Sequence, residues 1–360
     1  MKGWRNITLH RLALIGFGTV GQGLAEILLE KAEELLARYR YGARVVAISD
    51  SSIGSICHPD GLSLESLLAA VRETGSLAGY PDVPGLARDW DSLTTIRDSN
   101  ADIVVEATYT DLETGQPAVE HIRAAFETGK HVVTSNKGPA ALAYQELKAV
   151  AEAQDLYWGI EGTVMSGTPA LRLAQTALAG CAITEIHGIL NGTTNFILTQ
   201  MEEESTYADA LAQAQRLGYA EADPTADVEG HDALGKLLIL AAVVMDTPLA
   251  ADEVARRGIS HVTLEDVQQA RAQGQRWKLI ARLRRRDDGV EASVGPQMIP
   301  ASHPLAGVSG ATNAITYVTD LLGEVTLVGA GAGRRETGFS LLSDLLAIHR
   351  QCRGAIRSRE

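Results

Sequence analysis

Short apolar runs alternate with stretches of helical periodicity over the first third of the chain. Residues 11–17 (RLALIGF) form an apolar run bounded by glycine, which predicts a fully buried strand. Three further buried strands are predicted at residues 43–50, 101–110 and 129–139. The intervening residues 23–39 and 117–129 have helical spacing. This alternation predicts an α/β domain with a parallel, doubly wound sheet and right-handed crossovers.

The first strand leads into the glycine pattern Gly16-Phe17-Gly18-Thr19-Val20-Gly21 and then into a helix. In this context Gly16 permits the tight turn, Gly18 lets the backbone approach a pyrophosphate, and Gly21 lets helix and strand pack closely. The helix N-terminus offers free N–H groups and partial positive charge to phosphates. The motif therefore predicts a Rossmann-type dinucleotide-binding domain.

The second strand ends in Asp50, where an acidic residue normally accepts hydrogen bonds from the adenosine ribose and repels a 2′-phosphate. This favours NAD over NADP. Asp50 lies 29 residues beyond Gly21, further than the usual ~20, which a longer first helix would explain. Two alternatives stay open: Asp50 is a turn residue, or Ser51 and Ser52 help to hold a 2′-phosphate.

Thr108 and Lys137 follow the third and fourth predicted strands. Ligands of doubly wound sheets bind outside the carboxyl ends of the strands, so both residues are candidates for cofactor or substrate contact. A lysine after a strand is equally well explained as a solvent-facing loop residue.

A second domain, mixed α and β, is predicted from about residue 146. Residues 181–198 combine strand character with a polar turn at Asn191–Asn195. A helix follows at residues 206–217, with Ser205 or Thr206 as N-cap and Gly218 as terminator. The predicted division is 1–145 plus 311–360 for the nucleotide domain, which a C-terminal helix at 336–350 completes, and 146–310 for the second domain.

Residues 218–236 (GYAEADPTADVEGHDALGK) contain five carboxylates and one histidine. The following residues 233–245 carry one charged side chain, Lys236, so this helix is predicted to be buried nearly all round. Asp232 stands one turn earlier on the same face. Lys236 is thus a candidate for proton transfer, with a purely structural Asp232–Lys236 ion pair as the alternative. A metal site is disfavoured, because the carboxylate spacing matches no calcium loop.

Composition narrows the possible partners. A net charge of −13 argues against nucleic acid and anionic membranes as partners. The basic cluster Arg282–Arg286 precedes two aspartates and is interpreted as a solvated helix end and turn. Three scattered cysteines and the absence of a signal-peptide pattern predict a cytoplasmic location. The longest apolar run, 237–245, is too short to span a membrane.

At this point the chain resembles the homoserine dehydrogenase family over nearly its full length. The resemblance is carried by GFGTVGQG (16–23), TSNKGP (134–139), EGTVMSGTP (161–169), NGTTNFIL (191–198), residues 218–236, HPLAGVSGATNAI (303–315) and LVGAGAG (327–333). It implies NAD(P)-linked interconversion of L-aspartate 4-semialdehyde and L-homoserine in aspartate-family amino-acid biosynthesis, and a homodimer. The chain ends at Glu360, so a short form without the regulatory ACT domain, and no threonine feedback through one, is expected.

The resemblance also implies roles for individual residues. Lys236 and Lys137 would handle the proton at the reacting oxygen. The implied substrate-binding residues are Glu221, Asp232, Asp227, Thr193 and Tyr219. The implied cofactor-lining residues are Gly16, Phe17, Gly18, Thr19, Val20, Gly21, Asp50, Thr108, Lys137 and Gly333. A monovalent cation, Na⁺ or K⁺, would bind main-chain carbonyls near Glu161, Val164, Ser166 and Thr168.

Some positions depart from the family pattern. Met165-Ser166 stand where small glycines are usual, Ala330 replaces a proline, and Arg334-Arg335-Glu336 follow where small or polar residues are commoner. Two alternatives to a homoserine dehydrogenase are kept: a paralogue acting on another short amino-aldehyde or amino-alcohol, and a non-catalytic nucleotide-binding regulatory protein. Changed side chains near Glu221 and Asp232 would favour the first, and loss of Lys137 or Lys236 the second; neither is seen.

Overall fold

The computed structural model describes residues 8–357 and divides the chain into two compact units. The first unit comprises the chain up to Thr163 together with the segment from Gly333 onward, and the second comprises Val164–Ala332. The elements of the first unit are β1 (Thr8–Ile15), α1 (Thr19–Glu30), α2 (Ala32–Glu34), β2 (Tyr41–Asp50), β3 (Gly54–Cys57), α3 (Leu64–Thr74), β4 (Ala87–Arg88), α4 (Ser92–Asp98), β5 (Ile103–Glu106), α5 (Ala118–Glu127), β6 (His131–Thr134), α6 (Lys137–Leu142), α7 (Tyr144–Ala153), β7 (Trp158–Gly159) and α15 (Arg334–Arg357). The short helix α8 (Gly162–Met165) begins where this unit ends.

The first unit is a seven-stranded sheet in the order β4-β3-β2-β1-β5-β6-β7. Strands β2, β1, β5, β6 and β7 are parallel, and the edge strands β3 and β4 are antiparallel. The prediction of a doubly wound, Rossmann-type sheet is therefore confirmed, with an antiparallel edge added to it.

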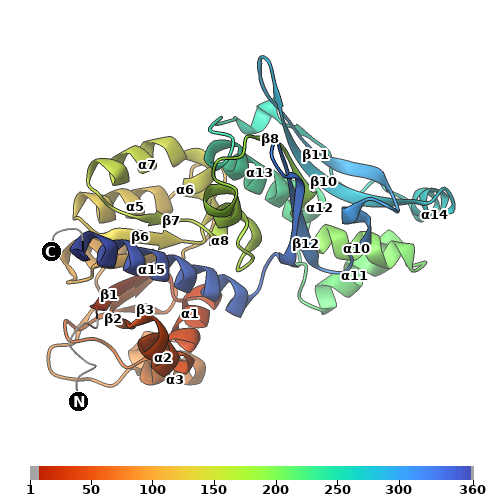
Figure 1. The fold of residues 1–360 in the computed structure, drawn as a ribbon. Helices are drawn as coiled ribbons and strands as arrows, with labels where there is room; N and C mark the ends of the chain where they lie inside the picture. The colour runs from red at the N-terminus through yellow and green to blue at the C-terminus, as the bar shows by residue number, and fades with distance from the viewer. Residues whose placement is uncertain (1–7, 358–360) are drawn as a thin grey trace. The chain divides into compact units, whose positions relative to one another are not determined.

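Helices cover both faces of this sheet because its strands are apolar on both sides (Figure 1). In β1, Leu12 and Leu14 pack into the core formed with α1, α3 and α15. The alternate residues Ala13 and Ile15 pack into the core formed with α4, α5 and α7. The C-terminal helix, longer than predicted, lies against α1 where Gly23 and Gly338 let the two backbones approach.

The second unit is built on a six-stranded sheet in the order β13-β12-β8-β10-β11-β9. All its pairings are antiparallel except that of β9 with β11. Its elements are α9 (Ala170–Arg172), β8 (Ile183–Ile189), α10 (Gly192–Glu202), α11 (Tyr207–Arg216), α12 (Thr225–Val228), α13 (His231–Val243), β9 (Ala255–Arg256), α14 (Leu264–Ala272), β10 (Gln275–Arg286), β11 (Gly289–Pro300), β12 (Thr312–Thr319) and β13 (Gly323–Ala330).

The two units differ from the predicted domains in two segments. Residues 146–163 belong to the first unit, because α7 packs into its core and β7 adds a parallel strand beside β6. Residues 311–332 belong to the second unit, because β12 pairs with β8 and β13 pairs with β12. The second difference arises from strand pairing between segments distant in sequence, since β8 and β12 are more than a hundred residues apart.

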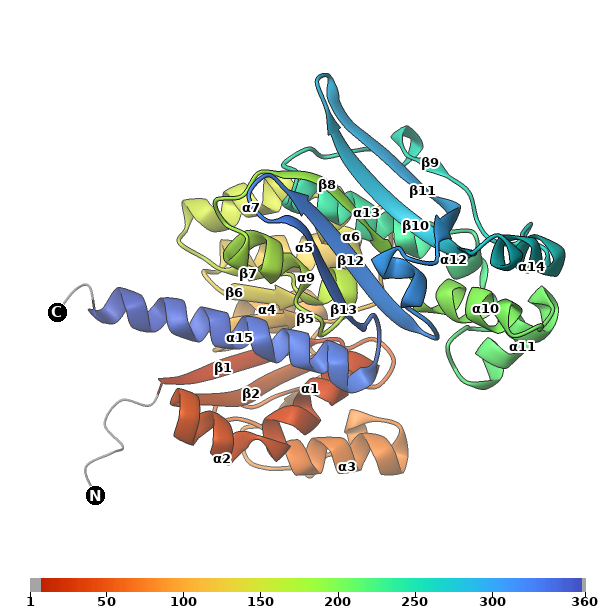
Figure 2. The same cartoon turned by 45° about the vertical axis from the view of Figure 1, so that its right-hand side comes forward.

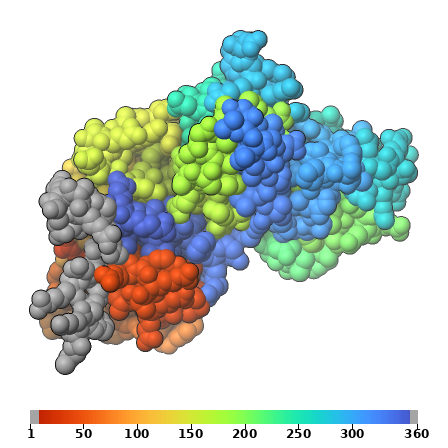
Figure 3. All heavy atoms as spheres, in the orientation of Figure 1, coloured from red at the N-terminus to blue at the C-terminus, as the bar shows by residue number. Residues whose placement is uncertain are grey.

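The interpretation of Arg282–Arg286 as a helix end is wrong. These residues are the last part of β10, which forms a long hairpin with β11 (Figure 2). Ala281 and Leu283 are buried, whereas Arg282 and Arg284, on the opposite face of the strand, both pair with Glu185. The predicted turn at Asp287-Asp288 is the hairpin tip, which stands out from the surface of its unit (Figure 3).

Two helix predictions in this unit hold. Thr206 caps α11, its hydroxyl accepting from the Asp209 amide at 3.2 Å. Every residue of α13 from Ala233 to Ala242 is buried, Lys236 included. The polar segment Asn191–Asn195 was predicted to be a turn, and this prediction is wrong. The segment is the start of α10, with the Asn191 side chain as N-cap. None of the helices within residues 8–357 is long and apolar enough to cross a membrane.

Candidate functional site

The three glycines of the β1–α1 turn occupy three different environments. Gly16 has a φ of +91°, and a Cβ there would lie 2.4 Å from the Ala107 carbonyl oxygen. A Cβ on Gly21 would lie 2.6 Å from the Gly16 oxygen, so helix and turn pack backbone to backbone. Gly18 instead faces open space, with nothing within 4 Å of its Cβ position. Because α1 begins there without a side-chain cap, the turn fits the pyrophosphate of a dinucleotide.

Asp50 connects this turn to the end of β2. Its Oδ2 accepts from the Phe17 amide at 2.8 Å, and its Oδ1 accepts from the Ser52 and Ile53 amides at 2.9 and 3.3 Å. Asp50 therefore shapes the β2–β3 turn as well as the glycine turn. The long spacing from Gly21 is explained by continued helical structure, since α2 and a π-helical turn at Leu35–Tyr39 extend α1.

Thr108 and Lys137 lie beyond the carboxyl ends of β5 and β6, as predicted. The Asn136 amide donates to the Tyr109 carbonyl at 2.8 Å and to the Thr108 carbonyl at 3.3 Å, which joins the two loops. Asn136 also caps α6, whose first residue is the half-buried Lys137. The two candidate residues thus sit on loops held to one another.

Beneath these loops lies Glu106, a carboxylate that the pattern of β5 did not single out. It is fully buried and accepts hydrogen bonds from the hydroxyls of Thr108 and Thr134. The His121 ring lies 3.6 Å from it. The acidic residue at the end of the apolar run IVVE is a sequence signal for this cluster, because a buried carboxylate needs hydrogen-bonding partners.

In the second unit, the Asn191 side chain is hydrogen-bonded to two carboxylates of the acidic stretch. The Asn191 amide donates to Asp227 Oδ1 at 2.7 Å and to Asp232 Oδ2 at 3.0 Å. The same Asp232 oxygen lies 2.8 Å from Lys236 Nζ. Lys236 also donates to the Leu190 carbonyl at 2.6 Å. The predicted Asp232–Lys236 pair therefore exists as part of a larger cluster, and Asn191 and Leu190 are members that the sequence did not reveal.

The electrostatics of this cluster distinguish its two carboxylates. Burial raises the pKa of Asp227, and the nearby Asp232 charge adds to the rise, against hydrogen bonds from Asn191 and Thr193. Asp232 instead carries the direct ion pair with the buried ammonium. The arrangement places one cation between a carboxylate and a main-chain carbonyl, with a second carboxylate close by.

The remaining substrate candidates border the cluster. The Thr193 hydroxyl donates to the Tyr219 carbonyl at 2.6 Å, which ties α10 to the acidic stretch. The Tyr219 ring is partly exposed and lies 5.1 Å from the Phe196 ring. Glu221 is exposed, and among the described residues its carboxylate makes no hydrogen bond to Asp227, Asp232 or Lys236.

The four candidate cation-binding positions are split between the units. Glu161, in the first, is buried and donates its amide to Asp344 at 3.0 Å. Val164 and Ser166, in the second, are buried, and Ser166 has a φ of +52°, a conformation that favours glycine. Thr168 donates its hydroxyl to the Ala330 carbonyl at 2.9 Å. Across residues 8–357, no three His, Cys, Asp or Glu side chains are grouped as metal ligands.

The unusual residues after Gly333 have a structural role within the first unit. Arg334 pairs with Glu26 at 2.6 Å, and Arg335 pairs with Glu30 at 2.7 Å. These contacts hold the start of α15 against α1, the helix that begins at the glycine turn.

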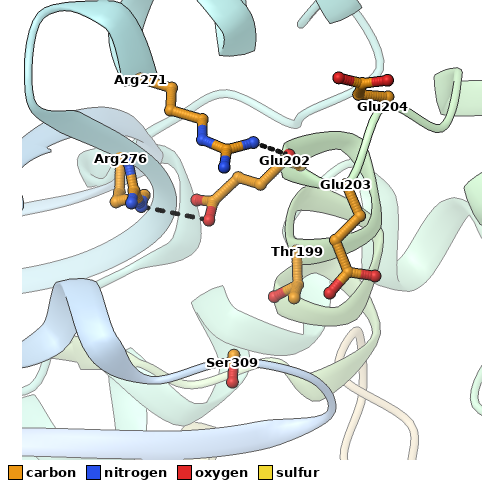
Figure 4. Close-up of a pocket in the computed structure, with 7 residues that line it drawn as sticks. All are labelled: Thr199, Glu202, Glu203, Glu204, Arg271, Arg276 and Ser309. Carbon is orange, nitrogen blue, oxygen red and sulfur yellow. Dashed lines mark hydrogen bonds and ion pairs between the residues drawn. The ribbon is translucent and has the colours of Figure 1, made fainter.

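A separate polar pocket lies at the other end of α10 from Asn191 (Figure 4). Six of its residues are Thr199, Glu202, Glu203, Arg271, Arg276 and Ser309. The Glu202 carboxylate pairs with Arg276 at 3.2 Å, and Arg271 donates to the Glu202 carbonyl at 2.7 Å. Burial raises the pKa of Glu202. None of the predicted substrate residues lines this pocket.

A dinucleotide-type glycine turn in one unit and a buried lysine paired with a carboxylate in the other define a nicotinamide-dependent oxidoreductase. Family models agree: one described as the NAD binding domain of homoserine dehydrogenase matches residues 16–161, and one described as homoserine dehydrogenase matches residues 169–346. The chain belongs to the homoserine dehydrogenase family.

Individual relatives support this assignment over nearly the whole chain. An NAD(+)-dependent homoserine dehydrogenase of Pseudomonas canavaninivorans is 46% identical over 95% of this chain and 97% of its own. A homoserine dehydrogenase of Methanocaldococcus jannaschii is 41% identical over 94% and 98%. The crystal structure of a putative homoserine dehydrogenase from Archaeoglobus fulgidus matches with a TM-score of 0.84 at 39% identity, covering 94% of this chain and 99% of that one.

Proposed function

We propose that the protein interconverts L-homoserine and L-aspartate 4-semialdehyde with a nicotinamide dinucleotide, as a step of aspartate-family amino-acid biosynthesis. The observation that carries the proposal is Lys236, a buried cation held by Asp232 and by the Leu190 carbonyl. When bound, the dinucleotide supplies or accepts the hydride. The chain must then bind the amino acid and manage the proton of the reacting oxygen.

Lys236 is assigned the proton transfer. In the reducing direction its ammonium polarises the aldehyde oxygen and donates the proton as the alkoxide forms. In the oxidising direction the neutral amine accepts the hydroxyl proton. Asp232 pairs with the Lys236 ammonium at 2.8 Å and holds it at the site. Lys137, which follows β6, is assigned a second proton-handling role near the same oxygen.

The carboxylates match the substrate, because both substrate and product carry an ammonium group. Asp227 and Asp232 both accept hydrogen bonds from the Asn191 side chain, so the two carboxylates lie close together. They provide a negative site lined by polar groups. Glu221, Thr193 and Tyr219 are assigned to the border of this site. Glu221 is exposed, so its carboxylate is open to a ligand that enters from solvent.

The dinucleotide is assigned to the first unit, along Gly16–Gly21, Asp50, Thr108, Lys137 and Gly333. NAD is the favoured cofactor, because the Asp50 charge at the end of β2 repels a 2′-phosphate. The Pseudomonas canavaninivorans relative is named as NAD(+)-dependent. NADP use stays within the family, since the solved structure of a hyperthermophilic archaeal homoserine dehydrogenase, 32% identical, contains NADPH.

Three further features belong to the same proposal. The protein acts as a homodimer in the cytoplasm, and the second unit provides both the substrate residues and the dimerising sheet. A Na⁺ or K⁺ ion binds main-chain carbonyls near Glu161, Val164, Ser166 and Thr168. Measuring turnover in buffers with and without each alkali cation tests the ion, and light scattering tests the dimer.

The first experiment is a steady-state assay of the purified protein with L-homoserine, comparing NAD⁺ and NADP⁺. Enzyme-like turnover with a preference for NAD⁺ is expected. Lys236→Ala is expected to abolish turnover while binding NADH as the parent protein does. Unchanged turnover in that variant would refute the assigned role. Nucleotide binding without turnover on homoserine would instead favour a paralogue that acts on another amino-aldehyde.

A further inference from the structure

The Leu190 carbonyl, which accepts a hydrogen bond from Lys236, also accepts one from the side-chain amide of Asn313. Asn313, the second residue of β12, is fully buried, and its Nδ2 donates to the Leu190 oxygen at 2.9 Å. That oxygen also accepts from Lys236 Nζ at 2.6 Å. Because a carbonyl accepts only, the nitrogen of the amide must face Leu190. One main-chain oxygen is therefore shared by a buried asparagine and the proposed proton-transferring lysine.

The rest of the Asn313 amide lies in a slot between two glycines. A Cβ at Gly331 would stand 2.0 Å from Asn313 Nδ2, and one at Gly192 would stand 3.4 Å from Oδ1. The Oδ1 atom is buried and makes no hydrogen bond to the described residues. An unsatisfied buried oxygen is unfavourable for stability, so the presence of an amide here is not explained by folding alone.

The segment that leads into Asn313 is tightly held. The Asn195 amide donates to the carbonyls of Val308, Gly310 and Thr312 at 3.2, 3.0 and 3.1 Å. The buried Lys278 donates to Asn195 Oδ1 at 3.1 Å and to the Val308 carbonyl at 2.8 Å. The segment before Asn313 is thus fixed by several hydrogen bonds. Such a rigid support suits a residue that must hold another group in place.

We infer that Asn313 is a positioning residue for Lys236, acting through the Leu190 carbonyl. A lysine side chain is long and flexible, and its ammonium rotates freely about a single acceptor. Asp232 alone does not define its direction, because a single acceptor leaves the ammonium free to swing around it. The Leu190 carbonyl is the second acceptor, and Asn313 sets its orientation. The inference rests on the proposed role of Lys236.

The first test is Asn313→Ala in the full-length protein. Loss of the amide frees the Leu190 carbonyl, and kcat for homoserine oxidation is expected to fall roughly 10- to 100-fold, since small displacements of a catalytic group have effects of this size. The KM for NAD⁺ and for homoserine is expected to stay within about threefold, because no ligand contact is removed. A purely structural role would lower the melting temperature without this split between kcat and KM.

A second variant reaches the same amide without removing it. Gly331→Ala places a methyl group against Asn313 Nδ2 and should displace the amide from Leu190. It is expected to reproduce the loss of kcat, and the Asn313→Ala/Gly331→Ala double variant should be no slower than the slower single variant. If Asn313→Ala does not fold, Gly331→Ala decides the question, since it retains the asparagine.

Thr316→Val is the matched control. Thr316 is buried on the same strand, and its hydroxyl bonds with that of Thr326 at 2.8 Å, away from Leu190. Its kcat should stay within about twofold of the parent. The inference is overturned if Asn313→Ala keeps the parent kcat, or if the two single effects multiply in the double variant. Loss of turnover in Lys236→Ala with full turnover in Asn313→Ala would overturn only this inference and leave the proposed function standing.

Discussion

We expect His10 to make the stability of the first unit sensitive to acid. It lies on β1, is 5% exposed, and its Nε2 is 3.1 Å from His349 Nδ1 on α15. Its ring also stacks on Tyr41, with 5.5 Å between centroids. Burial is the main reason that the pKa of His10 falls to about 4, and the adjacent His349 contributes, while Asp102 opposes the shift. The same strand ends at the glycine turn.

The sign of the effect follows from the two states. The unfolded chain binds a proton at His10 below a pKa of about 6.5, whereas the folded chain does so only near 4. The free energy of unfolding is therefore unaffected above about pH 6.5 and decreases as the pH falls from there toward 4. A difference of roughly 2.5 pH units corresponds to about 3 kcal/mol. For a unit of this size, that is a fall in melting temperature of roughly 6–12 °C.

The assay is thermal unfolding between pH 7 and pH 4, with the transition of the first unit identified by its shift on adding NADH. His10→Gln should be less stable at pH 7 and should lose less stability on acidification than the parent. His261→Gln, which changes an exposed histidine, should follow the parent at every pH. If His10→Gln and the parent lose the same stability between pH 6.5 and pH 4, the reasoning is refuted.

Three further substitutions test the site. Asp232→Asn leaves Lys236 buried without its carboxylate. Turnover should be lost, and the free energy of unfolding measured in urea should fall by about 3 kcal/mol. Unchanged stability would contradict the pairing. In Asp50→Asn, the one remaining oxygen cannot accept from all the amide donors of Asp50, so kcat/KM for NAD⁺ should fall about tenfold. The ratio of kcat/KM for NADP⁺ to kcat/KM for NAD⁺ should rise. An unchanged ratio would mean that Asp50 does not contact the ribose. Gly16→Ala places a methyl 2.4 Å from the Ala107 carbonyl in a left-handed backbone, which should cost about 3 kcal/mol or more and abolish NADH binding by fluorescence.

The features that the sequence predicted well are those set by neighbouring residues. The glycine turn, the buried strands around it and the buried helix α13 follow from local periodicity and from the conformational freedom of glycine. The Asp232–Lys236 pair follows in the same way, because residues four apart share a helix face. The strand at Arg282–Arg286 does not follow from its sequence, because Arg284, Arg285 and Arg286 are consecutive and break the alternation of buried and exposed positions. Pairing with β8 and β11 is what makes this segment part of β10.

What only the tertiary structure decided is how distant segments meet. Asn191 joins Asp227 to Asp232 because β8 delivers it to the start of α10, beside α13. Asn313 reaches the Leu190 carbonyl because β12 pairs with β8 across more than a hundred residues. Such contacts depend on strand pairing and packing, which no local pattern encodes. The sequence by itself determined the elements with clear local periodicity and the residue types available for chemistry. Packing between distant segments decided the remaining elements and which side chains contact the lysine.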